Sequence, residues 1–276
     1  MNIKMIKQRA REIAHVNKES LARICLIVGI FSAFPSLLNA NNFIIRMLHL
    51  IAIVLLMAVE QGYVVAGLKA VTDREYDLSD NDAVYGIVNW IEYIPTYLTK
   101  CVVNFVSIAI YILLILVLSL GSFAAIFASM DDSFGVTPIP SFVSDVSSLN
   151  LVLLLIVLIM GAILICWINL RMFAMTYLHQ EYGMKGFSAL KESFSLMKGH
   201  CWDLFKINLS FIGWIILCAI IELIITGLLG ENGVAGLLGA VLSAAVAAYT
   251  YKPSYITVLA LFYKELAYER YEKGTM

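Results

Sequence analysis

The sequence predicts an all-α polytopic membrane protein with six transmembrane helices and with amphipathic interfacial helices on the cytoplasmic side. Of its 276 residues, 61% are hydrophobic and 14% are charged, whereas soluble domains average about 45–50% apolar and about 25% charged residues. The apolar residues form runs long enough to cross a hydrocarbon core, which takes about 20 helical residues. The net charge of −1 provides no basic field for nucleic acid, so no nucleic-acid partner is expected.

Six apolar runs predict the spans, at residues 21–38, 43–68, 99–129, 149–178, 204–229 and 234–262. The first 23 residues contain six basic side chains, and no small-residue cleavage site follows the first run, so no cleaved signal peptide is expected. Residues 131–150 and 230–233 contain no Lys or Arg, whereas the loops of the opposite side carry several. By the positive-inside rule both termini are therefore expected in the cytoplasm.

These boundaries predict a single membrane domain over residues 1–276, in which a cytoplasmic segment precedes each of three helical hairpins. The hairpins are expected at residues 21–68, 99–178 and 204–263. The cytoplasmic segments are an amphipathic helix at 1–20, a loop with an interfacial helix at 69–98, an interfacial helix at 179–203 and a tail at 264–276.

Apolar residues at helical spacing mark the interfacial helices. The first has an apolar stripe of Ile3, Ile6, Ala10 and Ile13. The second is aromatic, and Pro95 is expected to separate it from the following span. The third provides a candidate face toward a partner or the membrane surface, formed by Phe187, Leu190, Phe194 and Met197. The alternative is that these segments are ordinary loops with aromatic anchors.

The stretch "SLMKGHCWDLF" connects the third interfacial helix to the fifth span. Gly199 is expected to end the helix in a left-handed conformation, with Lys198 complementing the helix dipole. His200, Cys201 and Asp203 lack a recognised ligand spacing, so no metal site is expected. The five cysteines are scattered without a CxxC pair and are interpreted as packing residues.

The same region resembles a known family. The stretches "ALKESFSLMKGHCWDLFKINLSFIGWIIL" and "KPSYITVLALFYKEL" are similar to the bacterial integral-membrane family catalogued as domain of unknown function 975. The matching positions are Ser193, Met197 to Gly199, Leu204, Phe205, Leu209 to Trp214, Pro253, Tyr255, Phe262, Tyr263 and Leu266. Ser254 departs from the pattern by separating Pro253 from Tyr255. The resemblance implies a bacterial cytoplasmic-membrane protein and assigns no activity, cofactor or catalytic residue.

Polar side chains within the apolar runs are the candidate functional residues, because charges inside a membrane are costly and usually face the bundle interior. They form a candidate intramembrane polar cluster of Arg46, His49, Glu60, Asn169, Arg171, Asn208 and Glu222. Depth along the spans predicts an outer ion pair between Arg46 and Glu222 and an inner pair between Glu60 and Arg171. Such pairs either fix helices together or line a ligand or ion pathway.

The last run is rich in small residues, and Gly239, Ser243 and Ala247 form a ridge that permits close helix approach within the chain or in a dimer. Lys252 and Pro253 interrupt this run. Proline leaves a backbone carbonyl without its helical donor, which makes Pro253 a candidate hinge or cavity wall.

Two functional hypotheses follow, and neither is enzymatic, because the sequence contains no nucleophile elbow, P-loop or zinc-protease motif. In the first, the protein is a membrane scaffold or accessory subunit acting through its cytoplasmic surface helices. In the second, it binds or transports a lipid or small amphiphile in a polar cavity. The expected partners are the lipid bilayer, with another membrane protein or an amphiphile as alternatives, and no cofactor is expected.

Overall fold

The structure is a computed structural model, and it describes residues 3–34, 43–72, 78–131, 141–229 and 233–271. Within these ranges the side chains of residues 43–51, 53–54, 117–131, 141–154, 229 and 233 lie outside the description.

The described residues form eleven α-helices and contain no strand, which confirms the all-α class. In chain order the helices are α1 (Ile3–Val16), α2 (Lys18–Ala33), α3 (Phe43–Thr72), α4 (Asn81–Val88), α5 (Trp90–Asp131), α6 (Ser141–Arg171), α7 (Met175–Tyr182), α8 (Gly186–Leu196), α9 (Cys201–Leu229), α10 (Gly233–Thr250) and α11 (Lys252–Tyr271).

Four stretches of the described helices are long and apolar enough to cross a membrane. They are Leu55–Thr72, Trp90–Leu116, Leu155–Tyr182 and Cys201–Leu228. A fifth span results if α10 and α11 are counted as one helix that bends by 63°. The chain is therefore built as a helical membrane protein with four to five such helices.

The chain divides into two compact units. Unit 1 comprises Met1–Thr99 and Arg171–Met276, and unit 2 comprises Lys100–Leu170. In unit 2 the Tyr111 hydroxyl of α5 donates to the Leu158 carbonyl of α6 at 3.2 Å, a hydrogen bond that joins these two helices. The predicted site residue Asn169 belongs to this unit and donates to the Ile165 carbonyl of its own helix at 2.9 Å.

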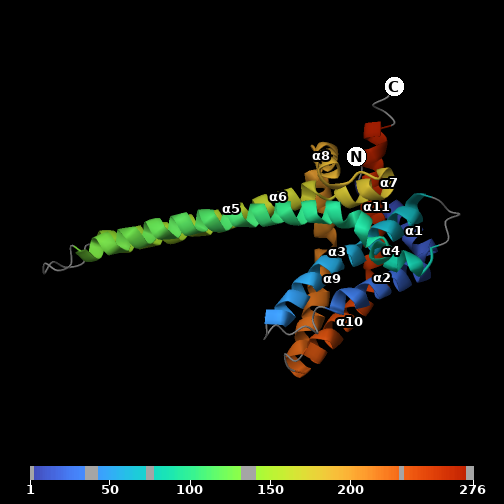
Figure 1. The fold of residues 1–276 in the computed structure, drawn as a ribbon, viewed down its shortest axis with the longest axis horizontal. Helices are drawn as coiled ribbons and strands as arrows, with labels where there is room; N and C mark the ends of the chain where they lie inside the picture. Colours follow the sequence, from blue (N-terminus) through green and yellow to red (C-terminus); the bar gives the residue numbers. More distant parts are fainter. Residues whose placement is uncertain (1–2, 35–42, 73–77, 132–140, 230–232, 272–276) are drawn as a thin grey trace. The chain divides into compact units, whose positions relative to one another are not determined.

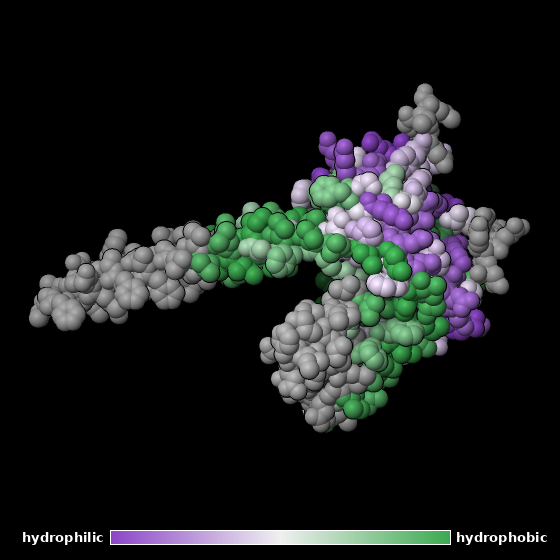
Figure 2. All heavy atoms as spheres, viewed as in Figure 1, coloured by the Kyte–Doolittle hydropathy of each residue, from purple (hydrophilic) through white to green (hydrophobic). Residues whose placement is uncertain are grey.

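Unit 1 has an apolar end and a polar end. The helices α2, α3, α9 and α10 extend toward the apolar end, whereas α1, α4, α7 and α8 gather at the other (Figure 1). Hydrophilic residues concentrate around this second group (Figure 2). Buried Leu21, Ile24 and Val28 of α2 form the centre of the core, with Ala66 of α3 and Ile256 of α11.

Small residues allow α4 to lie directly against α3. A β-carbon added at Gly86 would lie 1.9 Å from the Ala58 carbonyl oxygen, and one added at Gly62 would lie 2.5 Å from that of Ala83. Both distances are shorter than atomic contact permits. The crossing of these helices therefore requires glycine at both positions.

Two expectations about the interfacial helices are wrong. The apolar stripe of α1 is not free to face the membrane, because Ile6 and Ala10 are buried and α1 packs on α11. Pro95 does not separate a surface helix from the span, because it lies inside the continuous helix α5. The interruption falls at Asn89 instead, and Pro95, the sixth residue of α5, is accommodated inside the helix, where it leaves the Ile91 carbonyl without its helical donor.

Two predicted spans are interrupted. The fourth run, residues 149–178, contains a turn at residues 172–174 between α6 and α7. The sixth run, 234–262, breaks at Tyr251 between α10 and α11. The small residues of α10 serve packing within the chain, since α10 lies against α2 and α9. A β-carbon at Gly29 of α2 would lie 2.7 Å from the Ala244 β-carbon.

Candidate ligand cavity among the apolar helices

A cavity of about 320 Å³ lies among α2, α3, α9 and α10 and reaches the first residue of α11. Three charged side chains from three helices line it: Glu60 of α3, Glu222 of α9 and Lys252 of α11. Cys25 and Ser243 line it as well. The cavity thus brings together charged groups that the sequence places in separate apolar runs.

Lys252 owes its position to the break between α10 and α11. Tyr251 still donates its backbone N–H to the Ala247 carbonyl at 3.2 Å, and α11 then begins with Lys252 and Pro253. Proline suits the first turn of a helix because the N–H that it lacks would have no partner there. The resulting 63° bend coincides with the predicted hinge position, and whether Pro253 permits motion stays a prediction.

The ammonium of Lys252 lies against aromatic rings. Its Nζ is 4.4 Å from the centre of the Tyr63 ring and 5.8 Å from that of Tyr255. A cation over an aromatic face is stabilised by about 0.5–2 kcal/mol, most when water is excluded. Among the described residues the ion pairs do not include Lys252, Glu60 or Glu222.

Aromatic packing fixes the wall beside this lysine. Tyr251 lies 6.3 Å from Trp214, ring centre to ring centre, in a stacked arrangement. The Tyr255 hydroxyl donates to Asn208 Oδ1 at 3.1 Å, which connects α11 to α9. The predicted site residue Asn208 therefore positions a tyrosine next to Lys252.

The charges of the cavity favour a cationic guest. Two carboxylates and one ammonium leave one negative charge in excess. Charged groups at membrane depth usually pair or face a water-filled cavity, and a carboxylate gains most from a hydrogen-bonded cation. Among the described residues, no group of three or more His, Cys, Asp or Glu side chains has an arrangement that could hold a metal ion.

The predicted inner ion pair between Glu60 and Arg171 does not form. Glu60 lines the cavity, whereas the Arg171 guanidinium lies 5.6 Å from the Phe194 ring centre and donates to the Phe194 carbonyl at 3.5 Å. The Arg171 carbonyl also accepts the Ser193 hydroxyl at 2.6 Å. Arg171 thus holds α8 onto the end of α6. The side chains of Arg46 and His49 lie outside the described residues, and so does the predicted outer pair of Arg46 with Glu222.

The predicted surface face of α8 is mostly occupied by the protein itself. Leu190 and Met197 are only 9% and 0% exposed, whereas Phe187 is 77% exposed, and Phe194 packs under Arg171. The interpretation as a free partner face does not hold for Leu190 and Met197. The segment is a helix as the spacing predicts, but the apolar side of α8 packs against neighbouring helices of unit 1.

The connection from α8 to α9 follows the expectation for a helix end. Gly199 has a φ of +88°, the left-handed conformation that glycine adopts most readily, which confirms the prediction. His200 Nδ1 and Lys206 Nζ lie 3.9 and 3.6 Å from the Asp203 carboxylate, and the Cys201 thiol donates to the Met197 carbonyl.

A buried polar network escaped the sequence reasoning. Gln61 of α3 is 1% exposed; its Oε1 accepts the Tyr97 hydroxyl at 3.1 Å, and its Nε2 donates to Gln180 Oε1 at 3.3 Å. The Tyr93 hydroxyl donates to the same Gln180 oxygen. The only sign of this network in the sequence is the polar side chain of Gln61 within an apolar run.

A second branch of this polar network involves His179. Its Nδ1 lies 2.7 Å from the hydroxyl of fully buried Thr96, and the Thr96 hydroxyl oxygen accepts the Gly186 N–H at 3.2 Å. The His179 ring stacks on Tyr93 at 4.2 Å between ring centres. Together these bonds join α3, the start of α5, α7 and α8 at the polar end of unit 1.

Lys252 also lines the candidate site, but it was not among the charged residues predicted for it. Its signal was a lysine directly before a proline within an apolar run. The sequence pattern predicts only a helix break at this pair. The identity of the lysine matters because the break turns its ammonium into the cavity.

Helix content, apolar spans and a charged cavity among them define a helical membrane protein with an internal polar site. Residues 1–270 match the family described as Protein of unknown function (DUF975), and the chain belongs to this family. The resemblance noted for the last third of the chain thus extends over nearly all of it. Neither a curated protein nor a solved structure matches the chain.

Proposed function

We propose that this chain is a non-enzymatic, six-pass protein of the bacterial cytoplasmic membrane that binds a small amphiphile bearing an ammonium group. The observation that carries the proposal is the cavity in which Glu60, Glu222 and Lys252 meet among apolar helices. The carboxylates would hold the ammonium, and the aliphatic part of the ligand would lie along the apolar surfaces of the surrounding helices.

The size and access of the cavity support a ligand of this kind. A volume of about 320 Å³ lies at the lower end of small-molecule sites, which span about 300–1,000 Å³. Glu60 and Glu222 are exposed, so a ligand can reach both carboxylates without unfolding a helix. An amphiphile dissolved in the bilayer would reach the cavity from within the membrane, where few other groups can neutralise the two carboxylates.

The charge distribution supports the proposed orientation. The hydrophilic side chains of unit 1 gather around α1, α4, α7 and the end of α11 (Figure 2), and basic residues such as Lys4, Arg11 and Lys264 belong to these segments. Basic residues concentrate on the cytoplasmic side of membrane proteins. Both termini would then lie in the cytoplasm, with α2 as the first of six passes.

The scaffold hypothesis has less support. It relies on the cytoplasmic surface helices, and in the candidate partner face on α8 Leu190 and Met197 are buried, whereas Phe187 is exposed. A partner could use that face only after α8 had left its neighbours.

Titration calorimetry on the detergent-solubilised full chain tests the proposal with hexylamine, and with hexanol as the uncharged probe of equal chain length. Hexylamine is expected to bind more tightly than hexanol, because only its ammonium can pair with the carboxylates. Glu60→Gln and Glu222→Gln should each weaken hexylamine binding about tenfold, which corresponds to about 1.4 kcal/mol.

The matched control is Glu269→Gln, an exposed glutamate of α11 that does not line the cavity. This change should leave the affinity for hexylamine as it is in the wild type. Equal binding of the amine and the alcohol, or equal affinities in all three variants, would refute the proposal.

A further inference from the structure

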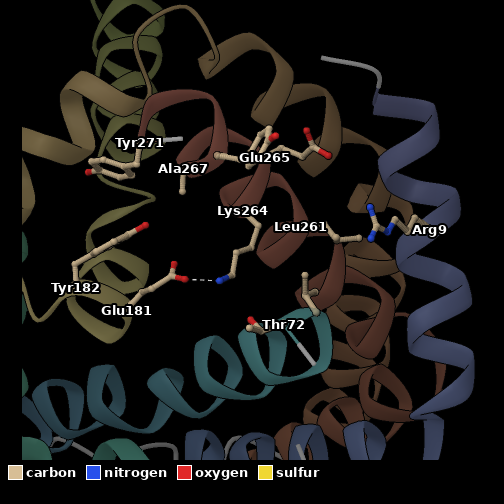
Figure 3. Close-up of a pocket in the computed structure, with 11 residues that line it drawn as sticks. Arg9, Thr72, Glu181, Tyr182, Leu261, Lys264, Glu265, Ala267 and Tyr271 are labelled. Atoms are coloured by element: carbon tan, nitrogen blue, oxygen red, sulfur yellow. Dashed lines mark hydrogen bonds and ion pairs between the residues drawn. The ribbon is translucent and has the colours of Figure 1, made fainter. Parts of the chain in front are cut away.

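A second pocket, of about 450 Å³, lies at the polar end of unit 1. It is formed by α1, the end of α3, α7 and α11 (Figure 3), and it shares no lining residue with the cavity described above. Four charged side chains line it: Arg9, Glu181, Lys264 and Glu265.

Two of these charges neutralise each other. Lys264 of α11 forms an ion pair with Glu181 of α7, drawn as a dashed line in Figure 3. Both side chains are about three-quarters buried, at 27% and 24% exposure. This pair fixes α7 against α11 and forms one wall of the pocket.

The other two charges are available to a ligand. Among the described residues neither Arg9 nor Glu265 takes part in an ion pair. Ile6 and Ala10, on either side of Arg9 along α1, are buried, so the backbone that carries Arg9 is fixed. The Arg9 side chain extends from α1 toward α11 (Figure 3).

Tyrosine rings form the opposite wall. The Tyr182 and Tyr271 ring centres are 5.0 Å apart, and the Tyr271 hydroxyl donates to Glu192 Oε1 at 3.1 Å. This hydrogen bond orients the Tyr271 ring. The rings thus close the pocket on the side away from Arg9 (Figure 3).

We propose that this pocket binds a zwitterion, a small molecule with an ammonium group and an anionic carboxylate or phosphate group. Arg9 binds the anionic group with its planar guanidinium, which suits both oxyanions, and the Glu265 carboxylate binds the ammonium. The lining has equal numbers of opposite charges, so neither a simple cation nor a simple anion satisfies it. The zwitterion comes either from a phospholipid headgroup or from a water-soluble amino acid or peptide.

The test is titration calorimetry on the detergent-solubilised full chain with two zwitterionic probes, glycerophosphoethanolamine and trialanine. Dimethyl phosphate and ethanolamine serve as the single-charge probes. At least one zwitterion is expected to bind more tightly than either single-charge probe. Arg9→Ala and Glu265→Ala should each weaken that binding about tenfold.

Matched controls are Arg11→Ala and Glu269→Ala, which remove exposed charges from the same two helices outside the pocket. Both should bind like the wild type. Tighter binding of glycerophosphoethanolamine would identify a lipid headgroup as the source, and tighter binding of trialanine a soluble ligand. The proposal is overturned if neither zwitterion binds, if a single-charge probe binds as tightly, or if Arg9→Ala and Glu265→Ala retain wild-type affinity.

Discussion

Replacing Gly86 by alanine is expected to lower the free energy of unfolding by about 2 kcal/mol, through overpacking that typically costs about 1–3 kcal/mol. The new β-carbon would lie 1.9 Å from the Ala58 carbonyl oxygen and 2.6 Å from the Gln61 β-carbon. Neither atom belongs to the end of a flexible side chain, so α4 would have to move away from α3. Thermal unfolding in detergent, followed by circular dichroism, measures the loss.

The control for Gly86→Ala is Gly213→Ala in α9, where an added β-carbon meets nothing within 4 Å. Alanine is a better helix former than glycine by about 1 kcal/mol. The control should therefore unfold at the same temperature as the wild type or at a higher one. If Gly86→Ala were as stable as Gly213→Ala, the close contact between α3 and α4 would not exist.

The second large effect is expected for Gln61→Leu, which keeps the side-chain volume but removes the hydrogen-bonding groups of Gln61. The Tyr97 hydroxyl would lose its acceptor, and the Gln180 oxygen and the Thr176 carbonyl would each lose one donor. Leaving a buried polar group without a partner costs about 1–3 kcal/mol. Thermal unfolding in detergent should show a correspondingly large fall in stability.

A double variant separates the hydrogen bond from packing. Gln61→Leu combined with Tyr97→Phe should lose less stability than the sum of the two single changes, because the second change removes the orphaned hydroxyl. Gln8→Leu is the control, since Gln8 is exposed and its side chain donates to exposed Glu12. Additive losses in the double variant would show that the hydroxyl and Gln61 do not interact.

Local features of the fold were predictable from the sequence. The apolar runs predict the helical class because a membrane-spanning backbone must satisfy its own hydrogen bonds. Gly199 was predictable as a helix end, since its role depends only on neighbouring residues. Pro95 misled the prediction because the effect of a proline depends on where its helix begins, and α5 begins five residues earlier, at Trp90.

Long-range packing was not predictable from one sequence. Helical spacing revealed apolar faces on α1 and α8, but it could not show that α1 packs on α11 or that Leu190 is buried within unit 1. Depth along the spans suggested a partner for Glu60, but depth does not determine which helices are neighbours. The cavity depends on the close approach of α2 to α10 at Gly29 and Ala244, two residues that are far apart in the sequence.

The central claim is that the cavity among the apolar helices holds an ammonium amphiphile. Native mass spectrometry of the full chain, extracted gently from its own membrane, tests this claim most directly. The wild type should carry an amine-containing adduct, and the Glu60→Gln Glu222→Gln double variant should lack it while the Glu269→Gln control keeps it. A wild type without such an adduct, or a double variant that retains it, would contradict the claim.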